Sequence, residues 1–299
     1  MVKTIDNDDL PVLISFSGGE TSAFMTIHLW NKYKHNKKLI VAFANTGQEN
    51  EETLIFVNKF QNQFNIPVVW VEAVINEEHG KGVTHKIVTY ETASRNGEPF
   101  EAVIKKLGIP NQANPHCTRD LKKTPLMKYM KSLGIKKFHT AIGIRADEID
   151  RMGDLYYPLV KQGVTKKHIN HFWDNQPFRL NLKGYQGNCK WCWKKSFRKH
   201  LTIINENPEA YDFPKRMEKE YGNYINPNRK KIQKARGEVV ELPIRFFRGN
   251  VSAEKLFEQA KGFTDFAIDD AKNNNYQTDI FNDFPLDISN GCSESCEPF

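Results

Sequence analysis

The sequence predicts an α/β fold built on a parallel sheet. Three apolar runs, at residues 12–16, 39–44 and 68–71, each have the length and composition of a buried strand. Between these runs, apolar residues recur at helical spacing. Strands that alternate with helices along a chain form parallel sheets that carry helices on both faces. A ligand of such a sheet is expected at the carboxyl ends of its strands.

Later elements follow in a less regular order. The pattern predicts helices at 100–107 and 121–133 and a fourth strand at 138–144, with the rest of the stretch 80–114 irregular. Two further helices, near 209–221 and 252–261, lie on either side of the basic stretch 228–231. The sequence therefore predicts a helical extension after the α/β part.

Composition limits the classes of protein to which the chain can belong. It has 299 residues, of which 39% are hydrophobic, so it can form a sizeable core. No apolar run is long enough to span a membrane, and the first ten residues lack an apolar segment. Five cysteines are too few for a disulfide framework. We therefore expect a cytoplasmic protein without a membrane partner.

Charge is distributed unevenly. Residues 264–299 contain eight acidic residues and one lysine, a formal charge of −7, which leaves +14 on residues 1–263 because the whole chain carries +7. A basic body favours polyanionic partners, either nucleotides or nucleic acid, and the acidic tail could cover a nucleic-acid groove. The alternative interpretation is ordinary solvated surface charge.

A glycine pair joins the first strand to the first helix. In Ser17-Gly18-Gly19 the backbone N–H groups can face outward, and the positive end of the helix dipole adds to them. Ser17 and Ser22 add hydroxyl donors, with Thr21 between them. This arrangement favours a phosphate group, although a purely structural turn remains the alternative.

The stretch from Ser17 to Ser22, Ser-Gly-Gly-Glu-Thr-Ser, resembles the PP-loop Ser-Gly-Gly-x-Asp-Ser of the adenine nucleotide α-hydrolase superfamily. Thr21 stands at the position of the aspartate, which in ATP-cleaving members helps to organise the metal and pyrophosphate. Further stretches resemble the phosphoadenosine phosphosulfate (PAPS) reductase branch in order: Asn45-Thr46-Gly47 with Glu52-Thr53, Cys117 to Lys122 with Pro125-Leu126, Gly143 to Glu148 with Arg151, and Gly187 to Cys192. Together these motifs cover about residues 11–200.

This resemblance implies a Rossmann-like, HUP-type fold that binds an adenine nucleotide, either ATP or PAPS, with magnesium as a further expected cofactor. Arg145 and Arg151 follow a strand and can bind phosphate or sulfate through bidentate hydrogen bonds, so we assign them catalytic roles. The alternative is an ion pair with a neighbouring acid, Asp147, Glu148 or Asp150. The expected nucleotide-binding residues are Ser15, Ser17, Gly18, Gly19, Thr21, Ser22, Asn45, Thr46, Gly47, Gly143 and Arg145.

Three cysteines are candidate metal ligands. Cys189 and Cys192 are spaced for one metal site, and Cys117 could supply a third sulfur from a distant loop. We favour a [4Fe-4S] cluster sheltered by Trp191, Trp193 and Phe197. The alternatives are zinc with a histidine such as His116 or His200, and unligated or redox-active thiols.

The resemblance bears on the choice of metal. Cluster-bearing reductases of this branch have a Cys-Cys pair where this chain has His116 and Cys117. That departure fits either a site with one histidine and three cysteines or a three-cysteine cluster with one open iron. An open iron resembles the arrangement in thiolating PP-loop enzymes.

Two more cysteines lie near the C-terminus, Cys292 and Cys296. PAPS reductases carry a nucleophilic cysteine in a mobile C-terminal Glu-Cys-Gly-x-His segment, which gives Cys296 a candidate catalytic role. Only the location and an acidic neighbour match that segment. The alternative is an exposed, flexible chain end, because acidic surroundings discourage the thiolate.

These observations divide the chain into a PAPS reductase-like PP-loop domain at 1–205, a basic helical extension at 206–263 and an acidic tail at 264–299. We expect an iron-sulfur enzyme of sulfur metabolism that uses ATP to transfer sulfur to a nucleic acid, either tRNA or DNA, from a sulfur donor. One alternative is reduction of PAPS to sulfite by a thiol reductant. Another is a non-catalytic nucleotide-binding or nucleic-acid-binding module. The sequence does not predict an oligomeric state.

Overall fold

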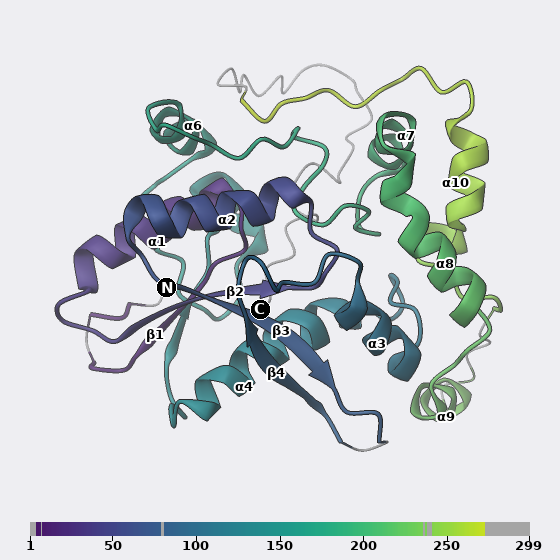
Figure 1. Cartoon of the computed structure of the whole chain (residues 1–299), viewed down its shortest axis with the longest axis horizontal. Coiled ribbons are helices and arrows are strands. Elements are labelled where there is room, and N and C mark those ends of the chain that lie inside the picture. The colour runs from purple at the N-terminus through teal and green to yellow at the C-terminus, as the bar shows by residue number, and fades with distance from the viewer. Residues whose placement is uncertain (1–3, 7, 79–80, 236, 238–240, 273–299) are drawn as a thin grey trace.

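A five-stranded sheet with helices on both faces forms the centre of the molecule (Figure 1). The computed structural model describes residues 4–6, 8–78, 81–235, 237 and 241–272. The sheet with helices on both faces confirms the α/β prediction. None of the helices in these ranges has the length and apolar character needed to cross a membrane.

The sheet has the strand order β4-β3-β2-β1-β5. Strands β1, β2, β3 and β5 are parallel, and β4 runs antiparallel to β3 at one edge. Ile14 of β1 pairs with Val41 of β2 on one side and with Ala141 of β5 on the other. The carboxyl ends of these three strands therefore meet at one edge. The strands are β1 Val12–Ser15, β2 Leu39–Asn45, β3 Val68–Ile75, β4 Val83–Val88 and β5 His139–Ala141.

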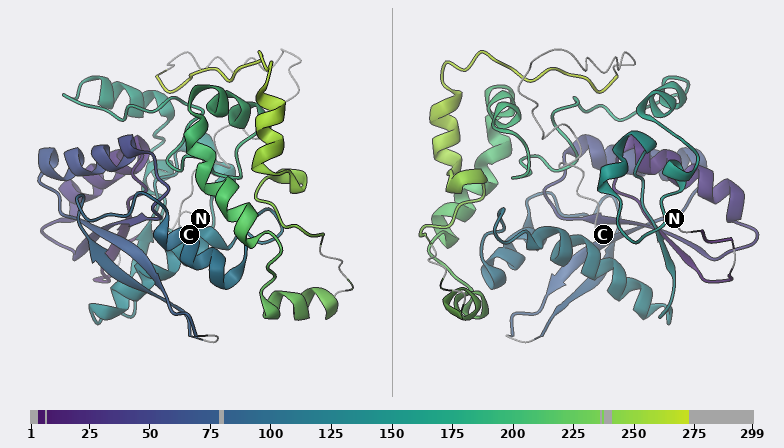
Figure 2. Two further views of the ribbon diagram at one scale, coloured as in Figure 1. Left: turned by 45° about the vertical axis from the view of Figure 1, so that its right-hand side comes forward. Right: turned by 180° about the vertical axis from the view of Figure 1, so that it is seen from behind.

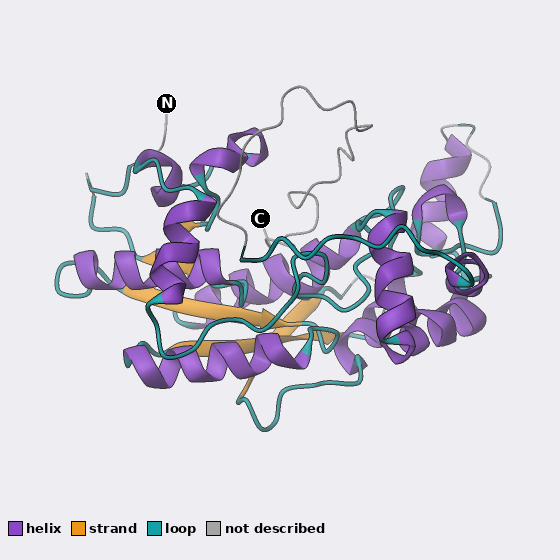
Figure 3. Ribbon diagram, turned by 90° about the horizontal axis from the view of Figure 1, so that it is seen from above, coloured by secondary structure: helices purple, strands orange, loops and turns teal. Residues whose placement is uncertain are grey.

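Helices cover both faces of the sheet, as the view from above shows (Figure 3). On one face, α1 (Glu20–Tyr33), α2 (Glu51–Phe64) and α6 (Lys166–Asp174) share a core with β1 and β2. On the other face, Leu126 and Met130 of α4 (Thr124–Ser132) pack against β1, β2 and β3. Burial of each such aliphatic side chain contributes about 1.5–3 kcal/mol.

Short helical segments connect these layers. A π-helical turn at Thr118–Lys123 precedes α4, so the predicted helix at 121–133 is confirmed but is irregular at its start. A 3₁₀ turn at Ala146–Arg151 follows β5, and α5 (Pro158–Lys161) precedes α6. The sequence pattern did not predict β4, α5 or α6.

The helical extension packs against the α/β part through a shared aromatic core. It contains α8 (Asp212–Tyr221), α9 (Pro227–Ala235) and α10 (Ala253–Ala260). Helix α7 (Phe197–Glu206) ends where this stretch begins, and Figure 2 shows α7, α8 and α10 grouped beside the sheet. Trp191 stacks on Phe213 of α8 with ring centroids 5.7 Å apart, and it contacts Phe246 at 4.8 Å. Phe100 of α3 (Glu98–Leu107) packs against the same rings.

A buried carboxylate, Glu218 of α8, ties this extension together. One of its oxygens accepts the Phe246 N–H at 3.0 Å, and the other accepts the Ala253 N–H at 2.9 Å. Arg245 lies 3.6 Å from the second oxygen. Burial nevertheless raises the pKa of Glu218 to about 7, so the fold favours the neutral acid.

Glu218 is therefore expected to make stability fall as the pH rises. Its contribution is fully present below pH 4.5, where both the folded and the unfolded chain hold the proton, and it is lost as the pH rises through the folded pKa of about 7. That difference corresponds to about 3 kcal/mol. Denaturant unfolding of wild type and of Glu218→Gln between pH 4.5 and 8 checks this. The variant should gain about 2–3 kcal/mol relative to wild type across the range, and parallel curves would contradict the assignment.

Candidate functional site

The first loop of the site joins β1 to α1 through Ser17, Gly18 and Gly19. Gly18 has a φ of 84°, and a Cβ atom there would lie 2.6 Å from Cγ2 of Thr53, so the position requires glycine. Gly19 has an extended backbone and is the N-cap residue of α1, and no side chain caps this end of the helix. The first N–H groups of α1 therefore lie at the carboxyl edge of the sheet with the positive end of the helix dipole, as an anion site requires.

The hydroxyl groups of this loop mainly hold its shape. Ser22 Oγ donates to the Gly19 carbonyl oxygen at 2.9 Å, and it accepts from the backbone N–H and the hydroxyl of Ser17 at 3.2 and 3.0 Å. Ser15 Oγ, at the end of β1, is buried and has no hydrogen-bond partner among the described residues. The predicted residues between Ser15 and Ser22 thus lie together at one edge of the sheet.

The second loop, Asn45-Thr46-Gly47, follows β2 and is pinned by buried acids. Asn45 donates to Oε1 of Glu72 at 2.6 Å and to the Ser94 carbonyl oxygen at 2.9 Å, and its own oxygen accepts the Gly47 N–H. The backbone N–H and the hydroxyl of Thr46 donate to the Glu49 carboxylate at 2.8 and 2.9 Å. The side chain of Asn45 is fully buried, so its contacts in the structure shape the loop.

The third loop follows β5 and brings Gly143 and Arg145 to the start of α1. A Cβ atom on Gly143 would lie 2.9 Å from Cα of Ser22, so the two backbones approach closely. Nη1 of Arg145 donates to Thr21 Oγ1 at 3.4 Å, and its Nε donates to Asp147 at 3.0 Å. The structure therefore places Arg145 beside the residue that replaces the PP-loop aspartate.

Arg145 and Arg151 share one carboxylate. Nη1 of Arg145 lies 3.4 Å from Oε2 of Glu148, and Nη1 of Arg151 lies 2.8 Å from Oε1 of the same group. The ion pairs that the sequence left as an alternative are thus present. Two guanidinium groups face Asp147 and Glu148 here, and Arg145 also reaches the PP-loop.

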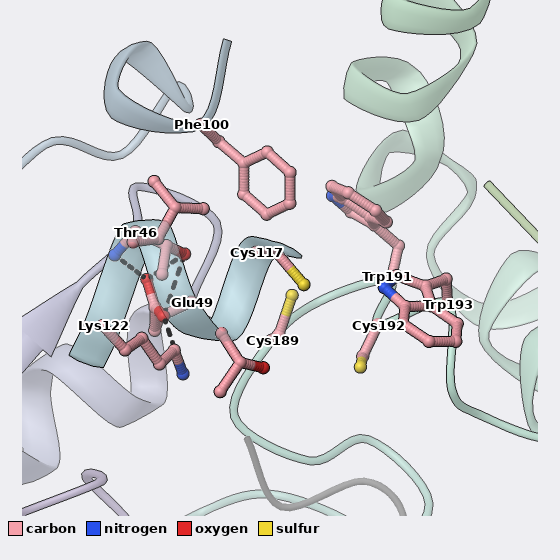
Figure 4. A pocket seen from close by; sticks show the side chains of 11 residues that line it. Thr46, Glu49, Phe100, Cys117, Lys122, Cys189, Trp191, Cys192 and Trp193 are labelled. Carbon is pink, nitrogen blue, oxygen red and sulfur yellow. Dashed lines mark hydrogen bonds and ion pairs between the residues drawn. The ribbon is translucent and has the colours of Figure 1, made fainter. Parts of the chain in front are cut away.

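The three cysteines from two distant segments line one pocket (Figure 4). Cys117 lies just before the π-helical turn, and Cys189 and Cys192 lie in the loop between α6 and α7. Cys189 forms an isolated β-bridge with Glu49, which brings the cysteine loop against the segment that follows the second loop. The remaining lining residues are Thr46, Glu49, Phe100, Thr118, Leu121, Lys122, Trp191 and Trp193.

The walls of this thiol pocket are apolar apart from two features. The Lys122 ammonium lies 3.7 Å from Oε1 of Glu49, with both side chains at least nine-tenths buried. The indole N–H of Trp193 is buried and has no hydrogen-bond partner among the described residues. A cation and a spare N–H donor beside three thiols suit an anionic sulfur species.

The histidines considered as zinc ligands do not line the thiol pocket. His116 Nε2 lies 3.0 Å from the Gly108 carbonyl oxygen, and burial lowers the pKa of His116 to about 4, so the ring is neutral at pH 7. His200 Nδ1 lies 2.6 Å from the Tyr211 hydroxyl, and burial lowers its pKa as well. Both rings are held by other contacts.

The donor chemistry of the pocket is compatible with an iron-sulfur cluster, because thiolates are the usual ligands of such clusters. Three thiols and no histidine line it, one ligand short of the four that either a structural zinc or a four-cysteine cluster takes. Among the residues that the structure describes, no three His, Cys, Asp or Glu side chains are close enough together to hold one metal ion. Cys292 and Cys296 lie outside the described residues.

Sequence reasoning missed several residues that build this site. Lys122 belongs to the Cys-x-x-x-x-Lys stretch, so its spacing from Cys117 was available as a signal. Glu49 carries no such signal, because its contacts with Lys122 and Cys189 join segments far apart in the chain.

Comparisons with known proteins agree with this geometry. The model of the phosphoadenosine phosphosulfate reductase domain matches residues 11–153. An uncharacterized nin region protein, ORF290, of Escherichia phage lambda is 32% identical over 194 residues, which cover 62% of this chain and 67% of the phage protein. The uncharacterized protein MJ0973 of Methanocaldococcus jannaschii is 25% identical over 187 residues, 62% of this chain and 36% of that protein. No solved structure matches the chain.

The matched region contains the PP-loop, the second nucleotide loop, Cys117 and both arginines. The sheet with its helices on both faces is the Rossmann-like architecture expected of the family. Family membership supports an enzyme of sulfur metabolism that binds an adenine nucleotide. The chain belongs to the phosphoadenosine phosphosulfate reductase domain family.

Proposed function

We propose that this protein is an iron-sulfur enzyme that uses ATP to transfer sulfur to a nucleic acid. The observation that carries the proposal is that one loop borders both the thiol pocket and the sheet edge with the PP-loop. Thr46 and Glu49 line the thiol pocket, and the same loop follows β2 at the edge where the PP-loop lies. Bond formation between an activated acceptor and a sulfur donor requires this proximity.

The nucleotide site binds the phosphates of ATP and offsets their negative charge. Backbone N–H groups at the start of α1 hold the phosphates, and Arg145 neutralises the oxygens of the reacting phosphate. Arg151 holds Glu148 in place beside Arg145. Magnesium, if it accompanies ATP, binds with the phosphates.

Cys117, Cys189 and Cys192 would hold a [4Fe-4S] cluster, which supplies an open iron position for sulfur. The aromatic walls exclude water from the pocket, and Lys122 and the Trp193 N–H offset negative charge inside it.

The reaction has two steps. An oxygen of the acceptor base attacks the α-phosphorus of ATP, and pyrophosphate leaves. Sulfide from an external donor then attacks the activated carbon, AMP leaves with the acceptor oxygen, and the sulfur stays on the base as a thiocarbonyl. The charge of +14 on residues 1–263 supports a nucleic acid as the acceptor.

PAPS reduction is the second candidate, favoured by the family description and by Thr21 in place of the PP-loop aspartate. There, the Cys296 thiolate attacks the sulfonate sulfur, and 3′-phosphoadenosine 5′-phosphate leaves. A second thiol then attacks Cys296, which forms a disulfide and releases sulfite. This route uses a cysteine of the tail and not those of the thiol pocket.

An assay under anaerobic conditions separates the candidates. The protein is incubated with ATP, ³⁵S-labelled sulfide and either unmodified tRNA or duplex DNA, and in parallel with PAPS and a dithiol. Sulfur transfer predicts AMP release that depends on the nucleic acid, with label in its bases. Sulfite from PAPS without such AMP release would establish the reductase, and neither product would favour a non-catalytic binding module.

A further inference from the structure

The loop that carries Cys189 and Cys192 is bonded to both nucleotide loops. The side-chain amide of Asn188 donates to the Ser17 carbonyl oxygen of the PP-loop at 2.9 Å. Asn50, at the start of α2, donates to the Gly187 carbonyl oxygen at 2.7 Å. Three more hydrogen bonds join the same loop to the segment after β2. The backbone N–H of Asn50 donates to the carbonyl oxygen of Asn188 at 2.8 Å, and the backbone N–H of Lys190 donates to the carbonyl oxygen of Gln48 at 3.0 Å. The indole N–H of Trp191 donates to the side-chain oxygen of Gln48 at 2.5 Å.

Asn188 lies directly against the phosphate-binding end of α1. A Cβ atom on Gly19 would stand 3.7 Å from Nδ2 and 3.8 Å from Oδ1 of Asn188. Gly19 is the residue before α1, where the helix has no side-chain cap. An anion bound at these N–H groups would therefore have the Asn188 amide as a neighbour.

The other end of the loop is fixed from inside the protein. The ammonium of Lys195, a residue only 1% exposed, donates to the Cys189 carbonyl oxygen at 3.0 Å. Cys189 also forms the β-bridge with Glu49. The loop is held at Asn188 and at Cys189. We therefore expect a displacement of Asn188 to move the adjacent Cys189 thiol as well.

We propose that Asn188 is a positioning residue that couples phosphate binding at the PP-loop to the arrangement of the thiol pocket. This inference rests on the nucleotide site of the proposed function. When the phosphates of an adenine nucleotide order the PP-loop, the Asn188 to Ser17 hydrogen bond holds the Cys189 loop against it. The coupling is reciprocal, so a disturbed thiol loop weakens nucleotide binding by the same factor.

Hydrogen–deuterium exchange of the full-length protein, with and without ATP and magnesium, tests this coupling in two peptides. One peptide covers the PP-loop, and the other covers residues 187–193. In wild type, ATP should slow exchange about fivefold or more in both. In Asn188→Ala and in Asn188→Leu, which is similar in size but has neither donor nor charge, saturating ATP should still protect the PP-loop and should no longer protect the second peptide.

Asn205→Ala is the matched control. Asn205 donates from its side chain to two carbonyl oxygens, those of Leu201 and Ala260, away from both loops, and its loss should leave both protections intact. Protection of 187–193 that persists in both Asn188 variants would overturn the inference. Wild-type protection of the PP-loop alone would overturn it while leaving the nucleotide site standing. No protection of either peptide would overturn the inference together with the nucleotide site.

Discussion

Gly18→Ala is expected to lower the free energy of unfolding by about 3 kcal/mol and to abolish ATP binding in the fraction that folds. A methyl group at position 18 would meet Thr53 at 2.6 Å, Phe43 at 3.1 Å and Val57 at 3.3 Å, and the backbone has a positive φ of 84°. The loop can relieve this overlap only by moving away from α2, which would turn the N–H groups of α1 away from the phosphates. Denaturant unfolding and calorimetric titration with ATP measure the two effects.

Gly163→Ala separates backbone strain from crowding. Gly163 also has a positive φ, 67°, but a Cβ atom there would meet nothing within 4 Å. Its replacement should cost only the left-handed backbone penalty of about 1–2 kcal/mol and should leave ATP binding unchanged. Equal losses of stability in the two variants would show that Gly18 is not packed against α2 as described here.

Arg145→Ala is expected to weaken ATP binding about thirtyfold, which corresponds to the loss of about 2 kcal/mol from a charge-assisted hydrogen bond. The guanidinium reaches the PP-loop through Thr21 and pairs with Asp147 and Glu148. Its removal takes away a cation and leaves two carboxylates to repel the phosphates. Calorimetric titration of wild type and variant with ATP gives the comparison.

Arg216→Ala is the control, because Arg216 on α8 forms a surface ion pair with Glu101 of α3. Its loss should leave ATP affinity unchanged. Arg145→Lys keeps the charge but not the planar donor pair, and it should fall between wild type and Arg145→Ala. An Arg145→Ala variant that binds ATP as tightly as Arg216→Ala would remove Arg145 from the nucleotide site.

The sequence was most informative where burial is continuous. Every residue of β1 is buried and so is most of β2, and such strands are recognisable as unbroken apolar runs. The edge strand β4 combines buried Val83 and Val88 with exposed Thr84 and Lys86, so its pattern is weak. Helix α6 was missed because its buried residues, such as Ile169 and Trp173, lie among lysines and histidines.

Predictions for the site divide in the same way. Gly18 and Gly47 could be predicted because a positive φ at a turn requires glycine. The meeting of Cys117 with Cys189 and Cys192 was anticipated from the Cys-x-x-Cys spacing and from the motifs that contain these cysteines. The bonds of Asn45 to Glu72 and of Asn188 to Ser17 could not be predicted, because they join segments 27 and 171 residues apart.

These contacts join the PP-loop, the loop after β2 and the cysteine loop. The second nucleotide loop forms part of the wall of the thiol pocket, and the cysteine loop rests on the PP-loop. Under the proposed function, this arrangement would let nucleotide chemistry and sulfur chemistry act on the same substrate.

Metal and sulfide analysis tests this account most directly. Wild type, Cys189→Ala and the tail variant Cys292→Ala are purified without oxygen, and iron, acid-labile sulfide, zinc and the visible spectrum are measured for each. The account predicts iron and sulfide with broad visible absorption in wild type and Cys292→Ala, and their loss in Cys189→Ala. Zinc alone, or no metal, in wild type would contradict a cluster held by the thiol pocket.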